Sequence, residues 1–528
     1  MTFQQYPSKL GIPSGNTAGR PTNPVIGDTY YNGELEILEI WNGTAWVAVS
    51  APPATPSISS VTDVGTGLAY ATGGTFTVVL TPGTGGSTAS QFNVSTTTGG
   101  FSASSSGTTV SLTGLTSNTS FVVVANAQNN FGTTVNSNPF SAVTATTAPQ
   151  TPTIGTATAS TSNTDVTVTW TLGSNGGKNL TSITITPFLN GTTAQTSQTA
   201  ATTSSTSHTF TGLTANSSYT FKVKATNANG TSPDSTATNS VTTANVMDVG
   251  YLVVAGGGGG GSDGGGGGGA GGLRSTVTGT GGSGSLETAL TIVKGTNYTV
   301  TVGGGGAAAS GNAGPAGTSG SNSVFSTITS TGGGGGGSWS TVPLTGGSGG
   351  GAGSNRTANG ADGTTGQGFR GGAGGNGGSF TGAGGGGGAA AQGGDNAGVS
   401  ANGTAGGAGR AVSITGSSVT YAGGGGGGIS QGIGGSAGAG GAGGGGAGSN
   451  AQAIAATAGT VNTGGGGGGG CEDNGAGGNG GKGVVVLRWL TSAGSITVGA
   501  GLTADATGTD GSFSYRRFTD GSGNVSWS

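Results

Sequence analysis

The residue types that most often do chemistry are scarce in this chain. Among its 528 residues there is one histidine, His208, and one cysteine, Cys471. Neither lies in the pattern of acids and nucleophiles that acid–base or covalent catalysis requires. Cys471 is followed by Glu472 and Asp473, but a metal site would need further ligands. We therefore expect no catalytic residues, no metal site and no cofactor, and we interpret the protein as non-enzymatic.

Nucleotide, nucleic-acid and membrane chemistry are also unsupported. Matches to G-x-G-x-x-G fall within residues 256–483, where glycine is so frequent that chance produces them, and no βαβ pattern surrounds them. The formal net charge is −3 with only 14 basic residues, so no basic patch is available for phosphates. No stretch of 18 consecutive apolar residues indicates a membrane span. We expect no nucleic-acid partner.

Bulky or charged side chains that interrupt the glycine-rich half are the best candidates for binding. They are Trp339, Arg356, Phe369, Arg370, Phe380 and Ile429. Aromatic and arginine side chains on a rigid frame are typical of carbohydrate or protein recognition. Trp339 and the Phe369-Arg370 pair are the preferred receptor contacts. The alternative, which stays open, is that these side chains cap the ends of the glycine-rich structure as small cores.

The elements that must position these side chains are dominated by glycine. Of the 127 glycines, 101 follow residue 250, and they come in runs between residues 256 and 470. Strand-like segments border the runs, as at Tyr251–Val254 and Val484–Trp489. This alternation argues against a disordered linker, and the clustering of glycines argues against the Gly-x-y repeat of collagen.

Because glycine has no side chain to bury, only its backbone N–H and C=O groups can hold such a block together. We predict that residues 245–490 form a slab of packed polyglycine helices of polyproline II type, flanked by short β-strands. The alternative is a disordered linker. Residues 286–302 are predicted to form a hairpin, and residues 491–528 a C-terminal β tail that ends in a hairpin or edge ribbon.

An internal repeat divides the first half of the chain. Residues 112–121 align without gaps onto residues 210–219, and the alternating pattern around them predicts half-buried strands. We infer two domains of similar size, residues 52–147 and 148–244. The segment 212–221 resembles the tyrosine corner of fibronectin type III domains. That resemblance implies two β-sandwiches with Trp170 and Tyr219 in the second core. Phe121 takes the place of the tyrosine in the first core and cannot form the corner hydrogen bond.

Residues 1–51 carry a different signature. Asn32-Gly33 and Asn42-Gly43 are turn dipeptides between short segments with exposed aromatic residues, a pattern that predicts a small β-meander. The pattern around Tyr30, Tyr31 and Trp46 resembles modules of tailed-phage fibre and structural proteins. The fold class expected for the whole chain is therefore all-β.

The glycine-rich block resembles the polyglycine-helix domains at the tips of phage fibres, on the strength of segments 251–255, 323–331 and 480–489, which adjoin glycine runs. This resemblance implies a non-enzymatic bacteriophage virion fibre, a tail fibre or adhesin that binds a host receptor. Its partners would be other virion structural proteins, through the N-terminal module, and a bacterial surface glycan or outer-membrane protein. Trimers are common among such fibres, so a homotrimer is implied, although no heptad segment requires one.

The N-terminus lacks the basic segment and apolar core of a secretory signal. We therefore expect synthesis in the host cytoplasm and location in the virion, an extracellular particle. Two alternatives remain open. One is a capsid decoration or head-fibre protein, and the other is a bacterial surface matrix protein.

Overall fold

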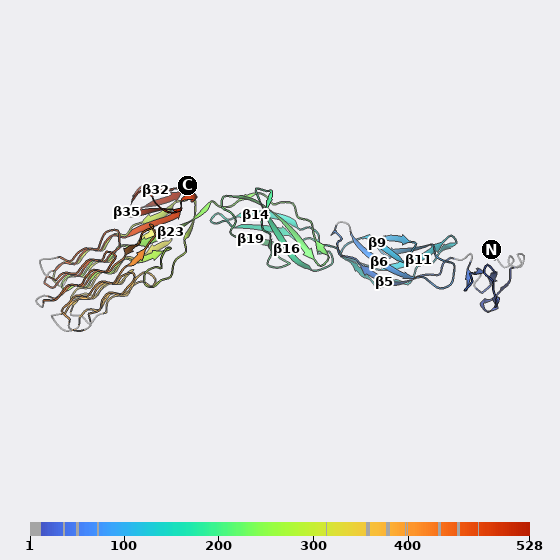
Figure 1. The fold of residues 1–528 in the computed structure, drawn as a ribbon, viewed down its shortest axis with the longest axis horizontal. Helices are drawn as coiled ribbons and strands as arrows, with labels where there is room; N and C mark the ends of the chain where they lie inside the picture. The colour runs from blue at the N-terminus through green and yellow to red at the C-terminus, as the bar shows by residue number, and fades with distance from the viewer. Residues whose placement is uncertain are drawn as a thin grey trace. The chain divides into compact units, whose positions relative to one another are not determined.

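The structure is a computed structural model. It describes residues 12–34, 37–48, 52–70, 73–312, 314–354, 359–375, 381–396, 398, 400–430, 434–450, 455–473 and 475–528. The chain divides into two compact units, unit 1 (Met1–Ala244) and unit 2 (Asn245–Ser528) (Figure 1). The fold is all-β. No described residue is in an α-helix, and the 3-10 turns that lie wholly within the described ranges are η2 (Thr17–Gly19) and η4 (Thr491–Ala493).

Unit 1 begins with a small sheet in the order β1-β2-β3-β4. Its strands are β1 (Ser14–Gly15), β2 (Thr29–Asn32), β3 (Ile37–Trp41) and β4 (Trp46–Ala48). Strands β2 to β4 pair antiparallel in sequence order, as a meander. Among the described residues of this module, Tyr30 is the one buried hydrophobic side chain, and its ring lies 5.8 Å from that of Trp46. Arg20 forms an ion pair with the buried carboxylate of Glu39. So small a core leaves apolar residues such as Val25 and Ile26 exposed.

The first sandwich packs two sheets around an aromatic and aliphatic core. One sheet has the order β5-β6-β9, the other has the order β12-β11-β7-β8, and β10 pairs with β13. The strands are β5 (Ser57–Asp63), β6 (Gly74–Thr81), β7 (Gln91–Thr96), β8 (Ser102–Ser105), β9 (Thr109–Leu115), β10 (Thr119–Phe121), β11 (Val123–Asn129), β12 (Gly132–Thr133) and β13 (Val143–Ala145). Phe121 lies in this core, 6.3 Å from Phe76 between ring centroids.

The second sandwich repeats this arrangement. Its sheets have the orders β14-β15-β19 and β17-β16-β20-β21, with β18 and β22 paired to β16 and β20. The strands are β14 (Thr153–Ala159), β15 (Val166–Thr171), β16 (Leu180–Leu189), β17 (Thr193–Ala194), β18 (Gln198–Thr199), β19 (Ser207–Phe210), β20 (Ser218–Asn227), β21 (Gly230–Thr231) and β22 (Val241–Thr242). Trp170 and Tyr219 are both in the core. The Tyr219 hydroxyl accepts a 3.2 Å hydrogen bond from the N–H of Thr214, a bond that Phe121 cannot form.

Unit 2 is built on a sheet with the path β24-β23-β31-β35-β26-β27-β28, to which β25, β32, β33 and β34 also pair. The strands are β23 (Val246–Val254), β24 (Leu273–Ser275), β25 (Leu290–Val293), β26 (Tyr298–Thr301), β27 (Ser323–Phe325), β28 (Ile328–Ser330), β31 (Val484–Leu490), β32 (Ile496–Val498), β33 (Leu502–Ala504), β34 (Gly508–Asp510) and β35 (Phe513–Trp527). A separate pair is β29 (Arg410–Val412) and β30 (Val419–Tyr421).

Two predictions about unit 2 are wrong. The C-terminal residues are not a separate tail, because β35 lies inside the sheet between β31 and β26 and contributes Phe518, Val525 and Trp527 to its core. Residues 286–302 do not form a hairpin, because β25 pairs with β23 whereas β26 pairs with β35 and β27. The pairings of β25 with β23 and of β35 with β26 join segments that are distant in the sequence, and local alternation carries no information about such partners.

The glycine-rich segments of residues 255–483, which we call the glycine array, extend from the sheet (Figure 1). The described residues of the glycine array contain neither α-helix nor 3-10 helix. The predicted slab of packed polyglycine helices is therefore not supported by the secondary structure. The segments are held by backbone hydrogen bonds to one another. Along Gly256–Gly261, the six N–H groups donate in turn to segments 318–321, 478–481 and 266–269, and the order then repeats. Three further segments donate to its carbonyls.

This packing explains why the runs contain only glycine. A Cβ atom at any position of Gly256–Gly261 would lie 1.9–2.2 Å from a backbone oxygen of a neighbouring segment. Segments on the outside of the array follow a different pattern, a short repeat with glycine at every third residue. This local repeat was not predicted from the sequence. In residues 314–320 every third residue is glycine, and a Cβ at Gly317 or Gly320 would lie 2.1 Å from a carbonyl oxygen of the 256–261 segment. Thr318 and Ser319 between them are exposed.

Candidate functional site

The four candidate binding residues that the structure describes differ in exposure and in their partners. Trp339, Phe369 and Arg370 are half-buried. Ile429 is only 3% exposed, so the structure does not present it to a receptor, and this candidate is withdrawn as a surface contact. Its N–H donates to Ser449 of a neighbouring segment. Arg356 and Phe380 lie outside the described residues.

Phe369 and Arg370 take part in the bonding between segments. The N–H of Phe369 donates to Gly388, and its carbonyl accepts from Gly349. The Arg370 guanidinium binds both carboxylate oxygens of Asp395, at 2.7 and 3.1 Å. The Arg370 guanidinium, which donates to this carboxylate, lowers the pKa of Asp395 from its ordinary value. These contacts of Phe369 and Arg370 join neighbouring segments of the glycine array, so a structural role explains them.

The segment around Trp339 is held by hydrogen bonds and carries exposed apolar side chains. We call residues 338–344 the Trp339 segment. Ser338 is buried, and its hydroxyl donates a 2.6 Å hydrogen bond to the carbonyl of Gly314 and lies 2.8 Å from the Thr341 hydroxyl. The N–H of Trp339 donates to Asp263, and the N–H of Leu344 donates to Gly335. The segment is therefore fixed to the array at both ends.

Fixing the segment exposes apolar side chains that sequence analysis did not single out. Val342 is 58% exposed and Leu344 39% exposed, next to the half-buried Trp339. A conformation held by hydrogen bonds loses little freedom on binding, which favours recognition by apolar contact. The available signal was Pro343, which stops the glycine pattern beside two aliphatic residues.

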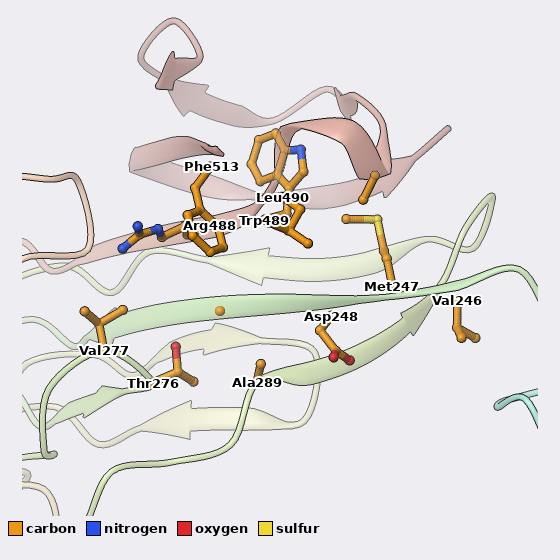
Figure 2. Close-up of a pocket in the computed structure, with 12 residues that line it drawn as sticks. Val246, Met247, Asp248, Thr276, Val277, Ala289, Arg488, Trp489, Leu490 and Phe513 are labelled. Atoms are coloured by element: carbon orange, nitrogen blue, oxygen red, sulfur yellow. The ribbon is translucent and has the colours of Figure 1, made fainter. Parts of the chain in front are cut away.

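A groove of about 750 Å³ lies elsewhere in unit 2, where β23 and β31 separate (Figure 2). It is lined by Val246, Met247, Asp248, Gly250, Thr276, Val277, Ala289, Arg488, Trp489, Leu490, Ala493 and Phe513. The Arg488 guanidinium stacks on the Phe513 ring, 4.2 Å from its centroid, and donates to Asp510 at 2.8 Å. Sequence analysis gave no sign of this groove, because its walls come from two parts of the chain, residues 246–289 and residues 488–513.

The residues with potential for catalysis or metal binding remain scattered. Across the described parts of the chain, no group of three or more His, Cys, Asp or Glu side chains is placed to hold a metal ion. Cys471 is buried and free. His208 lies 2.7 Å from the Gln198 amide oxygen, and burial lowers its pKa. Within the described ranges, no helix has the length and apolarity to cross a membrane.

Comparison with known families divides the chain in agreement with this fold. Residues 149–241 match the fibronectin type III domain, and residues 231–490 match the glycine-rich domain. The chain contains a fibronectin type III domain and a glycine-rich domain. The fibronectin type III match coincides with the second sandwich. The glycine-rich match begins within that sandwich, at residue 231, and continues over β23, the glycine array and β31.

Among solved structures, the chain is similar to domains A168–A170 of titin, at 18% identity over 40% of this chain and 76% of that chain, with a TM-score of 0.23. It is also similar to domains FN1–FN3 of chicken CNTN1, at 17% identity over 38% of this chain and 79% of that chain, with a TM-score of 0.24. Scores this low carry no argument. No curated protein matches the sequence.

Proposed function

We propose that the chain is a non-enzymatic fibre protein of a bacteriophage particle, which binds the host cell through unit 2. The observation that carries this proposal is the Trp339 segment, an apolar surface that hydrogen bonds fix to a close-packed backbone array. The low charge of the chain favours recognition by contact over electrostatic steering. The receptor class is a bacterial surface glycan or an outer-membrane protein.

The proposal includes a conformation for the glycine array. We propose that its segments are polyproline II-type helices, which have three residues per turn and no internal hydrogen bonds. Two observations support this conformation. The direction of the N–H bonds along Gly256–Gly261 repeats after three residues, and none of these glycines has a positive φ. Packed in this way, the segments would form a stiff platform for the Trp339 segment.

The proposal also gives unit 1 a role. The fibronectin type III sandwiches would serve as a spacer, and the N-terminal module would attach the chain to other virion proteins. The exposed Val25 and Ile26, at 70% and 75% exposure, support an attachment role, because the module buries little of its own apolar surface.

The test is binding of the labelled full-length chain to a panel of bacterial strains. We expect binding to a subset of strains, competed by their purified envelope glycan or lost when outer-membrane proteins are shaved by protease. The double variant Val342→Ser/Leu344→Ser should weaken binding at least tenfold. The matched control Val461→Ser changes a 62% exposed valine elsewhere in unit 2 and should bind as the wild type does.

Two results would contradict the proposal. Equal loss of binding in the control and the double variant would show that the Trp339 segment does not contact the receptor specifically. Absence of binding to every strain, together with immunogold labelling on phage capsids, would favour a capsid decoration protein instead.

A further inference from the structure

The groove between β23 and β31 is an interruption of the sheet. The antiparallel ladder joins Val254 to Val484 and continues to the pair of Gly250 and Arg488, where it stops. Both strands extend beyond this pair. β23 extends to Val246 along β25, and β31 extends to Leu490 along β35. The two strands therefore leave a gap with an unused edge on each side.

The directions of the backbone groups show which residues face the gap. On β23, the carbonyls of Asn245 and Tyr251 accept bonds from Lys294 and Thr276, so odd-numbered residues face the β24 and β25 side. Backbone groups alternate in direction along a strand, so those of Val246 and Asp248 face β31. By the same alternation, the N–H of Thr491 donates to Ser512 beside β35, so the N–H of Leu490 faces β23, whereas its carbonyl begins the 3-10 turn η4.

In the described structure, the N–H and C=O groups of Val246 and Asp248 and the N–H of Leu490 form no backbone hydrogen bond across the gap. Val246 and Asp248 are two residues apart on one edge, which is the spacing at which an added strand forms its bonds. Unpaired strand edges are templates for another chain, and domains that bind extended peptides use such edges.

The residues that line the groove restrict the kind of peptide that can bind there. Figure 2 shows Arg488, Trp489, Leu490 and Phe513 on one side, and Asp248, Thr276, Val277 and Ala289 on the other. Most of these side chains are apolar, and Leu490 is 47% exposed. The charge of Arg488 is neutralised by Asp510. Asp248 is exposed and has a hydroxyl partner, Thr291, at 2.6 Å, but it takes part in no ion pair within the described residues. The uncompensated charge of the groove is therefore negative.

We propose that this groove binds an extended peptide segment of a partner protein, which adds as a strand to the open edge of β23. The segment alternates apolar residues with at least one lysine or arginine, whose charge meets Asp248. Backbone hydrogen bonds to Val246 and Asp248 supply pairing, and the apolar lining receives alternate side chains. This site is separate from the Trp339 segment and does not depend on the proposed host-binding function.

The first experiment uses the full-length chain and a fluorescent hexapeptide, acetyl-Val-Lys-Val-Thr-Val-Thr-amide, in a polarisation assay. Two further peptides carry N-methyl groups on the odd or on the even residues, which removes the N–H donors of one peptide edge. Because a strand pairs along one edge, one methylated peptide should bind at least tenfold more weakly and the other within about twofold of the parent. Replacement of lysine by glutamate should weaken binding at least fivefold.

The second experiment tests the named residues. Asp248→Asn should reduce the preference for lysine over glutamate to less than twofold, and the control Asp234→Asn, an exposed aspartate of unit 1, should keep it. Hydrogen exchange adds a readout that needs no variant. The amides of Val246, Asp248 and Leu490 should exchange quickly in the free protein and at least tenfold more slowly with saturating peptide.

The proposal is overturned by any of three outcomes. The first is no binding of the parent peptide up to millimolar concentration. The second is equal binding of both methylated peptides, which would indicate adhesion without strand pairing. The third is strong protection of the three amides in the free protein, which would mean that the edge is already occupied.

Discussion

Replacement of one buried glycine by alanine tests whether backbone packing stabilises unit 2. At Gly260 a Cβ would lie 1.9 Å from the carbonyl oxygen of Gly468, whereas ordinary contact begins at 3.4 Å. The neighbouring segment must therefore move by 1.5 Å. That carbonyl accepts a 2.8 Å bond from Gly478, and Gly260 itself donates to Gly478 at 2.9 Å. A displacement of this size breaks at least one of the two bonds.

The expected cost follows from these contacts. Each buried hydrogen bond that is lost costs about 1–3 kcal/mol, and overpacking adds about 1–3 kcal/mol. Gly260→Ala should therefore destabilise unit 2 by at least about 2 kcal/mol. At about 2–4 °C per kcal/mol for a large domain, its Tm should fall by at least about 4 °C. Differential scanning calorimetry of the full-length chain measures this transition.

Gly304 provides the matched control within the same array. A Cβ there would have no heavy atom within 4 Å, and the φ of Gly304 is not positive. Gly304→Ala should leave Tm unchanged or raise it slightly. Alanine reduces the conformational entropy of the unfolded chain, which stabilises the folded state by about 0.4–1 kcal/mol. Equal Tm values for the two variants would refute the packing of the array and, with it, the stiff platform.

Three further measurements test other parts of the structure. Cys471, 2% exposed, should react with Ellman's reagent at least a hundredfold more slowly in the native chain than in guanidinium, because a buried thiol is poorly accessible; rapid native reaction would contradict its placement. Tyr219→Phe should destabilise the second sandwich by about 0.5–1.5 kcal/mol, because the Tyr219 hydroxyl accepts a hydrogen bond from Thr214. An unchanged calorimetric transition would show that this bond does not stabilise the domain. Because Arg370 lowers the pKa of Asp395, the stability from this pair is present above the ordinary aspartate pKa of 3.8 and is lost as pH falls below it. The Tm difference between wild type and Asp395→Asn, worth under about 1 kcal/mol for so exposed a pair, should therefore shrink from pH 6 to pH 2.5, and a constant difference would argue against the ion pair.

The features that local sequence could predict are those with a side-chain signature. Alternating apolar residues predicted the sandwich strands. The resemblance to fibronectin type III domains placed Trp170 and Tyr219 in the second core, and the gapless repeat placed Phe121 at the position of Tyr219 in the first. The strands at residues 251–254 and 484–489 were visible for the same reason. Their pairing with each other was not predicted, because register between distant segments is set by backbone bonds.

The candidate sites were harder to predict than the fold. Rarity in a glycine-rich background singled out Ile429, but rarity does not distinguish a presented side chain from a buried one. Exposure of Val342 and Leu344 depends on Ser338, whose hydroxyl anchors the segment to Gly314. The peptide groove depends on where a ladder stops, a property of paired strands that neither strand carries alone.

The spacing of glycines nevertheless records depth within the array. An interior segment meets neighbours in every direction, so each position of Gly256–Gly261 lacks room for a Cβ. An outer segment meets the interior on one side, so glycine is required only where the backbone turns inward. Gly403, Gly406 and Gly409 follow this rule, because a Cβ at each would lie 2.0–2.1 Å from a backbone oxygen. Runs of five or more glycines thus mark interior segments, and glycine at every third residue marks the surface, where side chains can be varied without disturbing the backbone bonds beneath them.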